Sequence, residues 1–352
     1  MMSAEGYATD ASTRHQVYVQ RFGAGQTGKA VKFIRKAISR AKETVRNGLS
    51  QYATARYYSQ LEALRKDLKA IYGDMTEQQL LNLGEFAEYE YRFNSSFLGK
   101  LVKASVKLNQ PSAEVIAEYV LNDQLELHVG AGRKRYRIAS ALAQFGDKKT
   151  ADIISEIGIG HSLGETQRQI IRRLTSLGVS HEEQAGALVN TVTNHASASA
   201  RSKQLQDNDD ILKGKQDIAT LDGRTTPYCR SIDHRVVPLD GPSPPYHWRC
   251  RTTQIPVLKD EYAREIPGSV RPAVGPDGAQ QVSSKTTYGE WLARQPASFQ
   301  KEVLGPTRYK LFSKGELSID RFVDGESGQQ YTLDQLKDLE PHAFQEAGLL
   351  SE

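Results

Sequence analysis

Apolar residues in the first half of the chain recur at alternating spacings of three and four positions. One such series is Val31, Ile34, Ile38, Ala41 and Val45, and the next is Leu61, Leu64, Leu68 and Ile71. Side chains at these spacings share one face of an α-helix and form the seam of helices packed in coiled-coil fashion. The pattern therefore predicts a domain of long helices over residues 28–208.

Breaks in this pattern predict where the helices begin and end. Residues 1–27 are polar and contain several glycines, which predicts a lightly packed arm. Gly73 and Asp74 predict a helix end, Pro111 predicts a helix start, and the segment 128–137 predicts a basic loop. Three pairs have the spacing of a capping box, and Gly178 has the place of a helix terminator. The pairs are Thr76 with Gln79, Ser162 with Glu165, and Ser180 with Glu183.

After Asn208 the helical period stops, and short runs of strand-forming residues follow. Residues 211–220, 236–237 and 252–257 are the predicted strands, with Gly and Pro marking the turns between them. We therefore expect a small β-rich core over residues 209–260, followed by a linker and a short, helical, acidic tail over 261–352. The expected fold class is α+β, with a mostly helical N-terminal half.

Composition and charge indicate the compartment and the kinds of partner to expect. The apolar runs are far shorter than the ~20 residues that span a bilayer, and the start lacks the apolar core of a secretory signal. Two cysteines form no disulfide framework, which favours a soluble protein in a reducing compartment. Residues 14–72 hold 13 Lys or Arg against 3 Asp or Glu, and residues 316–352 hold 2 against 9. The two ends therefore predict different neighbours.

The basic residues of the front half are candidates for contact with DNA phosphates. These candidates are Lys32, Arg35, Lys36 and Arg40 in a predicted helix, and Arg133, Lys134 and Arg135 in the basic loop. The alternative is an ordinary solvated helix face, which charge alone favours.

Chemically capable residues are densest between Leu221 and Leu258. Cys229, His247 and Cys250 could bind zinc, with His234 or Asp222 as the fourth ligand of a tetrahedral site. The incomplete ligand set favours the alternative, in which both cysteines are small buried residues and His247 is hydrogen-bonded in its loop.

The segments LDGRTTPYC, SIDHRVV and PPYHWRCRTTQIPV resemble the core signature of the phage Mu F-type head morphogenesis family, the minor head proteins. The segment from Tyr288 to about residue 325 is also similar to the one that follows this core. Two positions depart from the family pattern: His234 stands where Gly is usual, and Thr226 stands where many members have another Cys. The matching residues are Asp222, Arg224, Thr225, Cys229, Asp233, Pro244, Pro245, His247, Cys250 and Arg251.

This resemblance implies a minor capsid protein, made in the host cytoplasm and carried in several copies inside the head near the portal vertex. Its implied partners are the portal protein, the major capsid protein and packaged double-stranded DNA. We expect structural roles for the core residues, with Asp222 pairing with Arg224 across a turn and Arg251 bonding the same carboxylate or a backbone carbonyl.

The alternative to a structural protein is a hydrolase. Cys229 could act as a thiol nucleophile with His247 as base and Asp222 or Asp233 as the orienting acid, or Cys229, His247 and Cys250 could hold a catalytic zinc. Against the thiol version, these residues crowd into one turn-rich segment that carries no sign of an oxyanion hole. We therefore expect no enzymatic activity.

Overall fold

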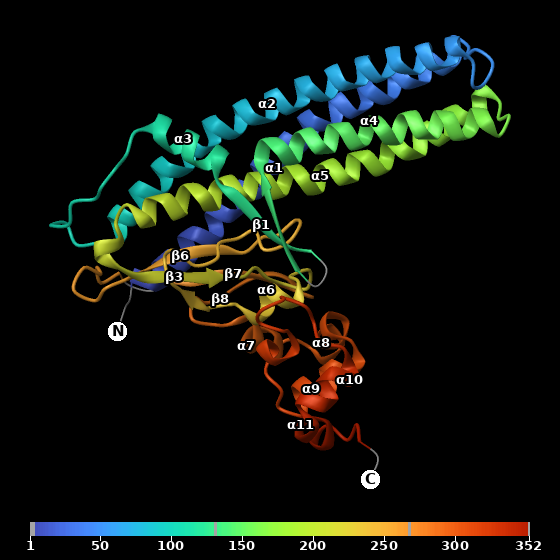
Figure 1. Ribbon diagram of the computed structural model, residues 1–352. Helices are drawn as coiled ribbons and strands as arrows, with labels where there is room; N and C mark the ends of the chain where they lie inside the picture. Colours follow the sequence, from blue (N-terminus) through green and yellow to red (C-terminus); the bar gives the residue numbers. More distant parts are fainter. Residues whose placement is uncertain (1–3, 130–131, 267–268, 351–352) are drawn as a thin grey trace.

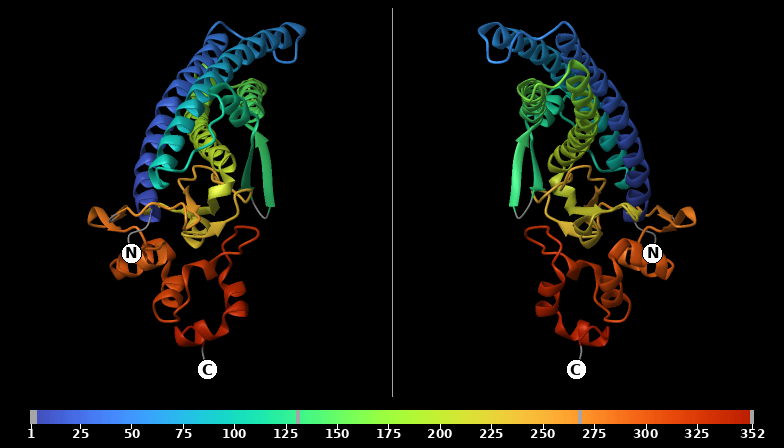
Figure 2. Two further views of the ribbon diagram at one scale, coloured as in Figure 1. Left: turned by 90° about the vertical axis from the view of Figure 1, so that its left-hand side faces the viewer. Right: turned by 90° about the vertical axis from the view of Figure 1, so that its right-hand side faces the viewer.

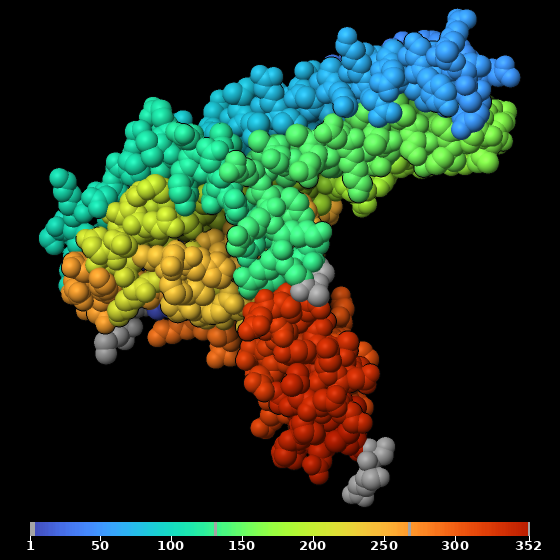
Figure 3. Space-filling view, in the orientation of Figure 1, coloured from blue at the N-terminus to red at the C-terminus, as the bar shows by residue number. Residues whose placement is uncertain are grey.

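The computed structural model describes residues 4–129, 132–266 and 269–350. In these residues a long helical arm rests on a smaller body of short strands and helices (Figures 1 and 3). The α+β fold class expected from the sequence is confirmed, with long helices first, small sheets next and short helices last.

Four long helices form the arm, and Figure 2 shows them running together above the body. The two helices of the first half, α1 and α2, each pack against both α4 and α5. Figure 1 shows the α1–α2 turn and the α4–α5 turn at the same end of the arm, where His161 Nε2 lies 2.9 Å from the carbonyl oxygen of Ser50. The four helices are α1 (Ala4–Arg46), α2 (Ala55–Leu101), α4 (Ile138–Ser162) and α5 (Gln167–Gln206).

The apolar seam read from the sequence is the core of this arm. Ile34 and Ile38 of α1 and Leu64 and Leu68 of α2 are buried in one cluster with Ile153 of α4. At 1.5 Å per residue, the 47 residues of α2 extend about 70 Å, so the arm is much longer than the body is wide. The hydrophobic effect acting on this seam therefore holds the helices together along their length.

The expectation of a lightly packed arm over residues 1–27 is wrong for the part that the structure describes. Residues 4–27 belong to α1, and residues 1–3 lie outside the described part. Polarity misled the prediction, because the polar side chains here are buried and bonded to other helices. His15 Nε2 lies 2.7 Å from Glu90 Oε1, and Gln16 Nε2 donates to Asn194 Oδ1 at 2.7 Å.

The predicted helix break at Gly73 and Asp74 is also wrong, because α2 runs through both residues. Tyr72 and Met75 on either side are buried in the arm, and their packing outweighs the weak helix propensity of one glycine. Thr76 and Gln79 therefore form no capping box, and the Gln79 side chain donates instead to the Gln26 carbonyl at 3.4 Å.

The second helical hairpin begins and ends at other residues than predicted. The capping box of α5 is formed by Thr166 and Gln169, not by Ser162 and Glu165. Gly178 and Ser180 lie inside α5 rather than at a helix boundary. A Cβ atom at position 178 would lie 3.2 Å from Ile38 Cγ1, so Gly178 lets α1 approach closely.

The predicted helix from Pro111 is shorter than expected, and the predicted basic loop contains a strand. Helix α3 spans Ala113–Asn122, and β1 (Gln124–Val129) then pairs antiparallel with β2 (Gly132–Arg137). Leu125 and Leu127 alternate with polar residues and are buried, the period of a strand rather than a helix. Residues 130–131, between the strands, lie outside the described part.

The body contains two small sheets of three strands each. In the first, β3 (Leu212–Ile218) lies between β5 (Val236–Val237) and β6 (Thr253–Leu258), all antiparallel. These strands match the three predicted segments. In the second, β4 (Leu221–Asp222) pairs parallel with β7 (Val270–Gly275), which pairs antiparallel with β8 (Gly278–Ser283). The second sheet lies partly in the segment expected to be a linker, so that expectation is corrected.

Short helices complete the body. Buried residues from both sides of position 260, including Cys229, Cys250 and Trp291, share one hydrophobic cluster. No helix among the described residues is long and apolar enough to cross a membrane. The short helices are η1 (Asp209–Ile211), α6 (Pro227–Ser231), α7 (Tyr288–Ala293), α8 (Ala297–Leu304), α9 (Pro306–Ser313), η2 (Ile319–Phe322), α10 (Leu333–Leu339) and α11 (Pro341–Glu346).

Candidate functional site

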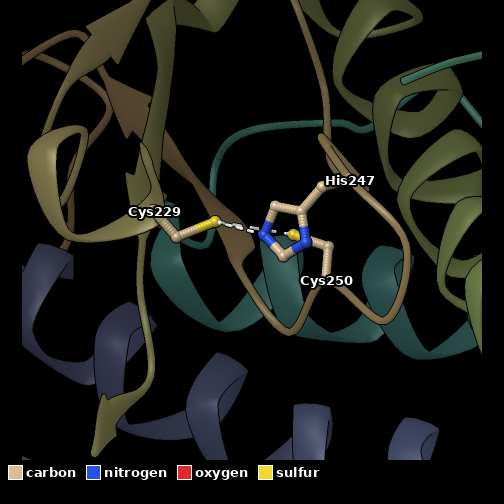
Figure 4. A group of neighbouring side chains, drawn as sticks. All are labelled: Cys229, His247 and Cys250. Atoms are coloured by element: carbon tan, nitrogen blue, oxygen red, sulfur yellow. Dashed lines mark hydrogen bonds between the residues drawn. The ribbon is translucent and has the colours of Figure 1, made fainter. Parts of the chain in front are cut away.

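Cys229, His247 and Cys250 meet in the body, although 21 residues separate the two cysteines in the chain (Figure 4). The two Sγ atoms lie 3.7 Å apart, and Cys229 Sγ lies 3.1 Å from His247 Nε2. Both cysteines are buried and free. Their separation far exceeds the ~2.05 Å of a disulfide bond, so the two sulfurs face each other as thiols or as ligands.

Local structure places Cys229 at the start of a one-turn helix. Thr226 is the N-cap of α6, and its Oγ1 accepts the Cys229 amide at 3.5 Å, while Pro227 stands in the first turn. The same Thr226 oxygen lies 2.8 Å from His247 Nε2. Thr226 therefore belongs to the site.

The turn from His247 to Cys250 is held against the helical arm. Arg249 adopts a φ of +60°, which bends the chain so that the Cys250 amide donates to the His247 carbonyl at 3.1 Å. Asn194 of α5 donates to the Cys250 carbonyl at 2.8 Å, and Thr191 Oγ1 accepts the Arg249 amide at 2.9 Å. Helix α5 therefore fixes the position of two of the three candidate ligands.

Asp222 forms an ion pair with Arg251, the residue that follows Cys250. The Arg251 guanidinium donates two hydrogen bonds to the Asp222 carboxylate, at 2.5 and 2.7 Å. Thr225 Oγ1 donates to the same carboxylate at 3.1 Å. Burial alone would raise the pKa of Asp222, but the bonds and charge of Arg251 hold it below its usual value.

The expected pairing of Asp222 with Arg224 is a minor contact. The Arg224 side chain is 86% exposed and its nearest contact to the carboxylate is 3.8 Å, although the Arg224 amide donates to Asp222 Oδ1 at 3.0 Å. Of the two arginines considered from the sequence, Arg251 is the principal partner, because a bidentate guanidinium contact is shorter and stronger.

Asp233 anchors a second buried ion pair, which sequence reasoning missed. Its carboxylate accepts from Arg271 of β7 at 2.9 Å, and both side chains are almost fully buried. The amides of Ala219 and Tyr288 also donate to it, each at 2.7 Å. The turn expected at Asp233 thus joins β3, β7 and α7. No sequence signal singled out Arg271, because it lies in a segment expected to be a linker.

His234 does not complete a metal site. Its backbone has a φ of +66°, the left-handed conformation that glycine adopts at least cost. Its Nε2 lies 3.0 Å from Arg271 Nη1. Asp222 is likewise taken by Arg251, so neither supplies a fourth ligand. Among the described residues, the candidate ligands are Cys229, His247 and Cys250, whose donor atoms lie within 4.8 Å of one another.

The separation of the two sulfurs nevertheless fits zinc. Two sulfurs bound tetrahedrally at ~2.3 Å would lie about 3.8 Å apart, close to the 3.7 Å observed. A cavity of about 130 Å³ that Thr226, Cys229 and His247 line adjoins the site. Two thiolates and an imidazole are a ligand set that zinc prefers.

The pKa values of Cys229, Cys250 and His247 are shifted in different directions. Burial and the neighbouring Cys250 raise the pKa of Cys229. Burial also opposes ionisation of Cys250, but hydrogen bonds from Cys229 and His247 lower its pKa. Burial opposes protonation of His247, yet the Cys250 sulfur raises its pKa. Cys250 is therefore the thiol that ionises first, which suits a ligand for a cation.

The sequence analysis also missed a third buried carboxylate of the body, that of Asp217. Asp217 of β3 is fully buried and accepts hydrogen bonds from Tyr246 at 2.5 Å, Gln254 at 3.0 Å and Arg235 at 3.0 Å. Burial raises the pKa of Asp217 to about 6. An aspartate in the middle of a predicted strand is unusual, and that signal could have identified it.

The predicted DNA-binding residues lie on two separate elements. Lys32, Lys36 and Lys134 are exposed and have no carboxylate within 4 Å in the described part of the chain. The four arginines are paired: Arg35 with Glu182, Arg40 with Asp67 and Glu43, and both Arg133 and Arg135 with Glu126. The free positive charge of these groups is therefore carried by the lysines.

Comparisons with protein-family models, curated proteins and solved structures find no match. The resemblance to minor head proteins therefore rests on the residues of this chain alone.

Proposed function

We propose that this chain is a minor head protein of a tailed bacteriophage, a structural part of the virion near the portal vertex that takes part in head assembly. One observation carries the proposal: contacts join the first and last blocks of the family-like signature. Asp222 of the first block binds Arg251 of the last, and Cys229 of the first meets His247 and Cys250 of the last. Residues that match a signature and hold one another in place are expected of a fold-defining core.

The shape of the molecule supports the same proposal. An arm built on helices of up to 47 residues reaches well beyond the body and offers a long surface for repeated contacts. The portal protein and the major capsid protein are the proposed partners for these surfaces. The exposed lysines of α1 and β2 are the proposed contacts with packaged double-stranded DNA, because lysines bind phosphates by charge.

A thiol or zinc hydrolase is the second candidate function. The observation in its favour is the contact of Cys229 with His247 beside a cavity of about 130 Å³. Against it, burial raises the pKa of Cys229, which disfavours the thiolate that a nucleophile needs. His247 Nδ1 lies 2.9 Å from the Trp248 carbonyl oxygen rather than a carboxylate, so no acid orients the ring. We therefore favour the structural role.

The proposal is tested by locating the protein in particles. Heads are purified from cells carrying the phage that encodes this chain, and the chain is sought in a cryo-EM reconstruction made without imposed symmetry. We expect density for the arm and body near the portal vertex, in several copies, and cross-links from the arm to the portal protein. Purified, infectious heads that lack the chain would overturn the proposal.

A further inference from the structure

A second cavity lies where the helical arm meets the body, away from the cysteine cluster. Its volume is about 350 Å³, and its walls come from α5, from the α3–β1 junction, from β3 and from the loop 239–244. The walls are mostly polar, and the exposed Asp240 lies at the edge. The size is near the lower end of the range for small-ligand pockets, ~300–1,000 Å³.

A buried ammonium group faces this cavity. Lys215 of β3 is 1% exposed, and its Nζ donates one hydrogen bond, to Ser243 Oγ at 2.6 Å. An ammonium group has three hydrogens to donate. Within the described part of the chain, no carboxylate oxygen lies within 4 Å of this nitrogen. Buried charges are normally paired with an opposite charge, because removing a charge from water is costly. Lys215 is therefore a buried cation without a paired anion among these residues.

Hydroxyl groups surround the same space. Ser202 Oγ and Ser243 Oγ lie 2.9 Å apart, and Ser243 Oγ also accepts the hydrogen bond from Lys215. Ser199, on the same helix as Ser202, is 2% exposed and lines the cavity, and its Oγ has no hydrogen-bond partner in the described part of the chain. An unpaired buried hydroxyl is uncommon in proteins. It supplies a second donor that points to a missing acceptor.

The acids around the cavity do not neutralise Lys215. Burial lowers the pKa of Lys215 to about 8, and Asp217, Asp240 and Asp123 only partly oppose that shift from a distance. Asp217 is already bonded to Arg235, and Asp123 lies 3.7 Å from His195. Glu126, which also lines the cavity, is paired with Arg133 and Arg135. Each of these carboxylates is thus bonded to another residue or exposed.

We propose that this cavity binds a small oxyanion, a phosphate or carboxylate group, through Lys215 Nζ, the Ser199 hydroxyl and whichever of the Ser202 and Ser243 hydroxyls does not donate to the other. The anion supplies the missing counter-charge to Lys215 and the missing acceptor to Ser199. The ligand is either a free anion or the terminal phosphate of a nucleic acid, since both present the same group. This site is independent of the proposed virion role.

The test is calorimetric titration of the full-length protein with inorganic phosphate and, separately, with malonate. We expect saturable binding of at least one of them. Lys215→Met should weaken that binding tenfold or more, because a hydrogen bond to a charged group is lost. Lys213→Met is the matched control on the same strand, since Lys213 is exposed and bonded to Asp260. It should bind as the unaltered protein does.

Ser199→Ala is a second variant that tests anion binding even if Lys215→Met fails to fold. The Ser199 hydroxyl has no hydrogen-bond partner among the residues that the structure describes, so its removal leaves the fold intact while weakening anion binding several-fold. An oligonucleotide with and without a 5′-phosphate distinguishes the two sources: dependence on that phosphate and on Ser199 indicates a nucleic-acid end. Absence of binding for every anion, or binding unchanged in Ser199→Ala, overturns the proposal.

Discussion

Single residues hold the body together where short strands cannot. Two ion pairs, Asp222 with Arg251 and Asp233 with Arg271, tie turns to strands that are far apart in the chain. Removing one member of such a pair leaves the other charge buried and unpaired, which costs about 3–5 kcal/mol. Cys229 and Cys250 lie in the same hydrophobic cluster, so the metal-binding candidates are part of the same core.

At this scale we expect the purified protein to bind one zinc ion per chain. Cys229, His247 and Cys250 offer three donor atoms within 4.8 Å of one another, and hydrogen bonds lower the pKa of Cys250. Cys250→Ser should lose the metal, and chelation should lower the thermal midpoint of the unaltered protein by several degrees. Metal content by mass spectrometry and thermal unfolding give the measurements.

His342→Ala is the control for the zinc measurement, because His342 is 84% exposed and distant from the cysteines in the chain. It should keep its metal. A protein that carries no zinc after growth in zinc-containing medium would show that the cysteines serve only as buried apolar residues.

At the scale of elements, the arm depends on where its helices can approach each other. Tyr72 of α2 lies between two glycines with opposite surroundings. A Cβ atom at Gly73 would meet nothing within 4 Å, whereas one at Gly146 of α4 would lie 2.7 Å from Tyr72 Cβ. The first glycine only weakens its helix, and the second is needed for the contact between α2 and α4.

We therefore expect opposite effects from two alanine substitutions. Gly73→Ala should stabilise the protein by about 0.5–1 kcal/mol, because alanine is the better helix former. Gly146→Ala should destabilise it by about 1–3 kcal/mol through overpacking. Denaturant unfolding followed by circular dichroism measures both. Destabilisation by Gly73→Ala would mean that α2 is interrupted there, as the sequence first suggested.

Periodicity predicted the seam of the arm, because burial of one helix face leaves a repeat in the sequence. The strands β3, β5 and β6 were predicted by the end of that period, by strand-forming residues and by the Gly and Pro turns between them. It missed the start of α1, where His15 and Gln16 are buried by bonding to Glu90 and Asn194 across the arm. The cysteines and His247 were recognised as a group by their rarity and spacing. Of the ion pairs that support them, the contact of Arg251 with Asp222 was expected from the sequence. The pairing of Asp233 with Arg271 was missed, because it joins residues 38 positions apart and leaves no local pattern.

For the whole molecule, charge is distributed along the arm, and the candidate DNA-binding residues of α1 differ in whether a carboxylate pairs with them. Arg35 and Arg40 of α1 are neutralised by Glu182 and Asp67, whereas Lys32 and Lys36 of the same helix face solvent. If the arm meets packaged DNA, these lysines supply the contact. Sequence-independent binding of this kind weakens steeply with salt, because each neutralised phosphate releases a counterion.

We expect the purified protein to bind double-stranded DNA weakly, and the Lys32→Glu, Lys36→Glu double variant to bind about tenfold more weakly at low salt. The slope of log affinity against log salt should fall by about 2, since each lost lysine–phosphate contact removes about 0.9. The Lys285→Glu, Lys310→Glu variant has the same net charge but alters exposed lysines of the body. Fluorescence anisotropy with a labelled duplex compares the two. Equal losses in both variants would mean that total charge, rather than the arm, governs the interaction, and the assignment of DNA contact to α1 would then be wrong.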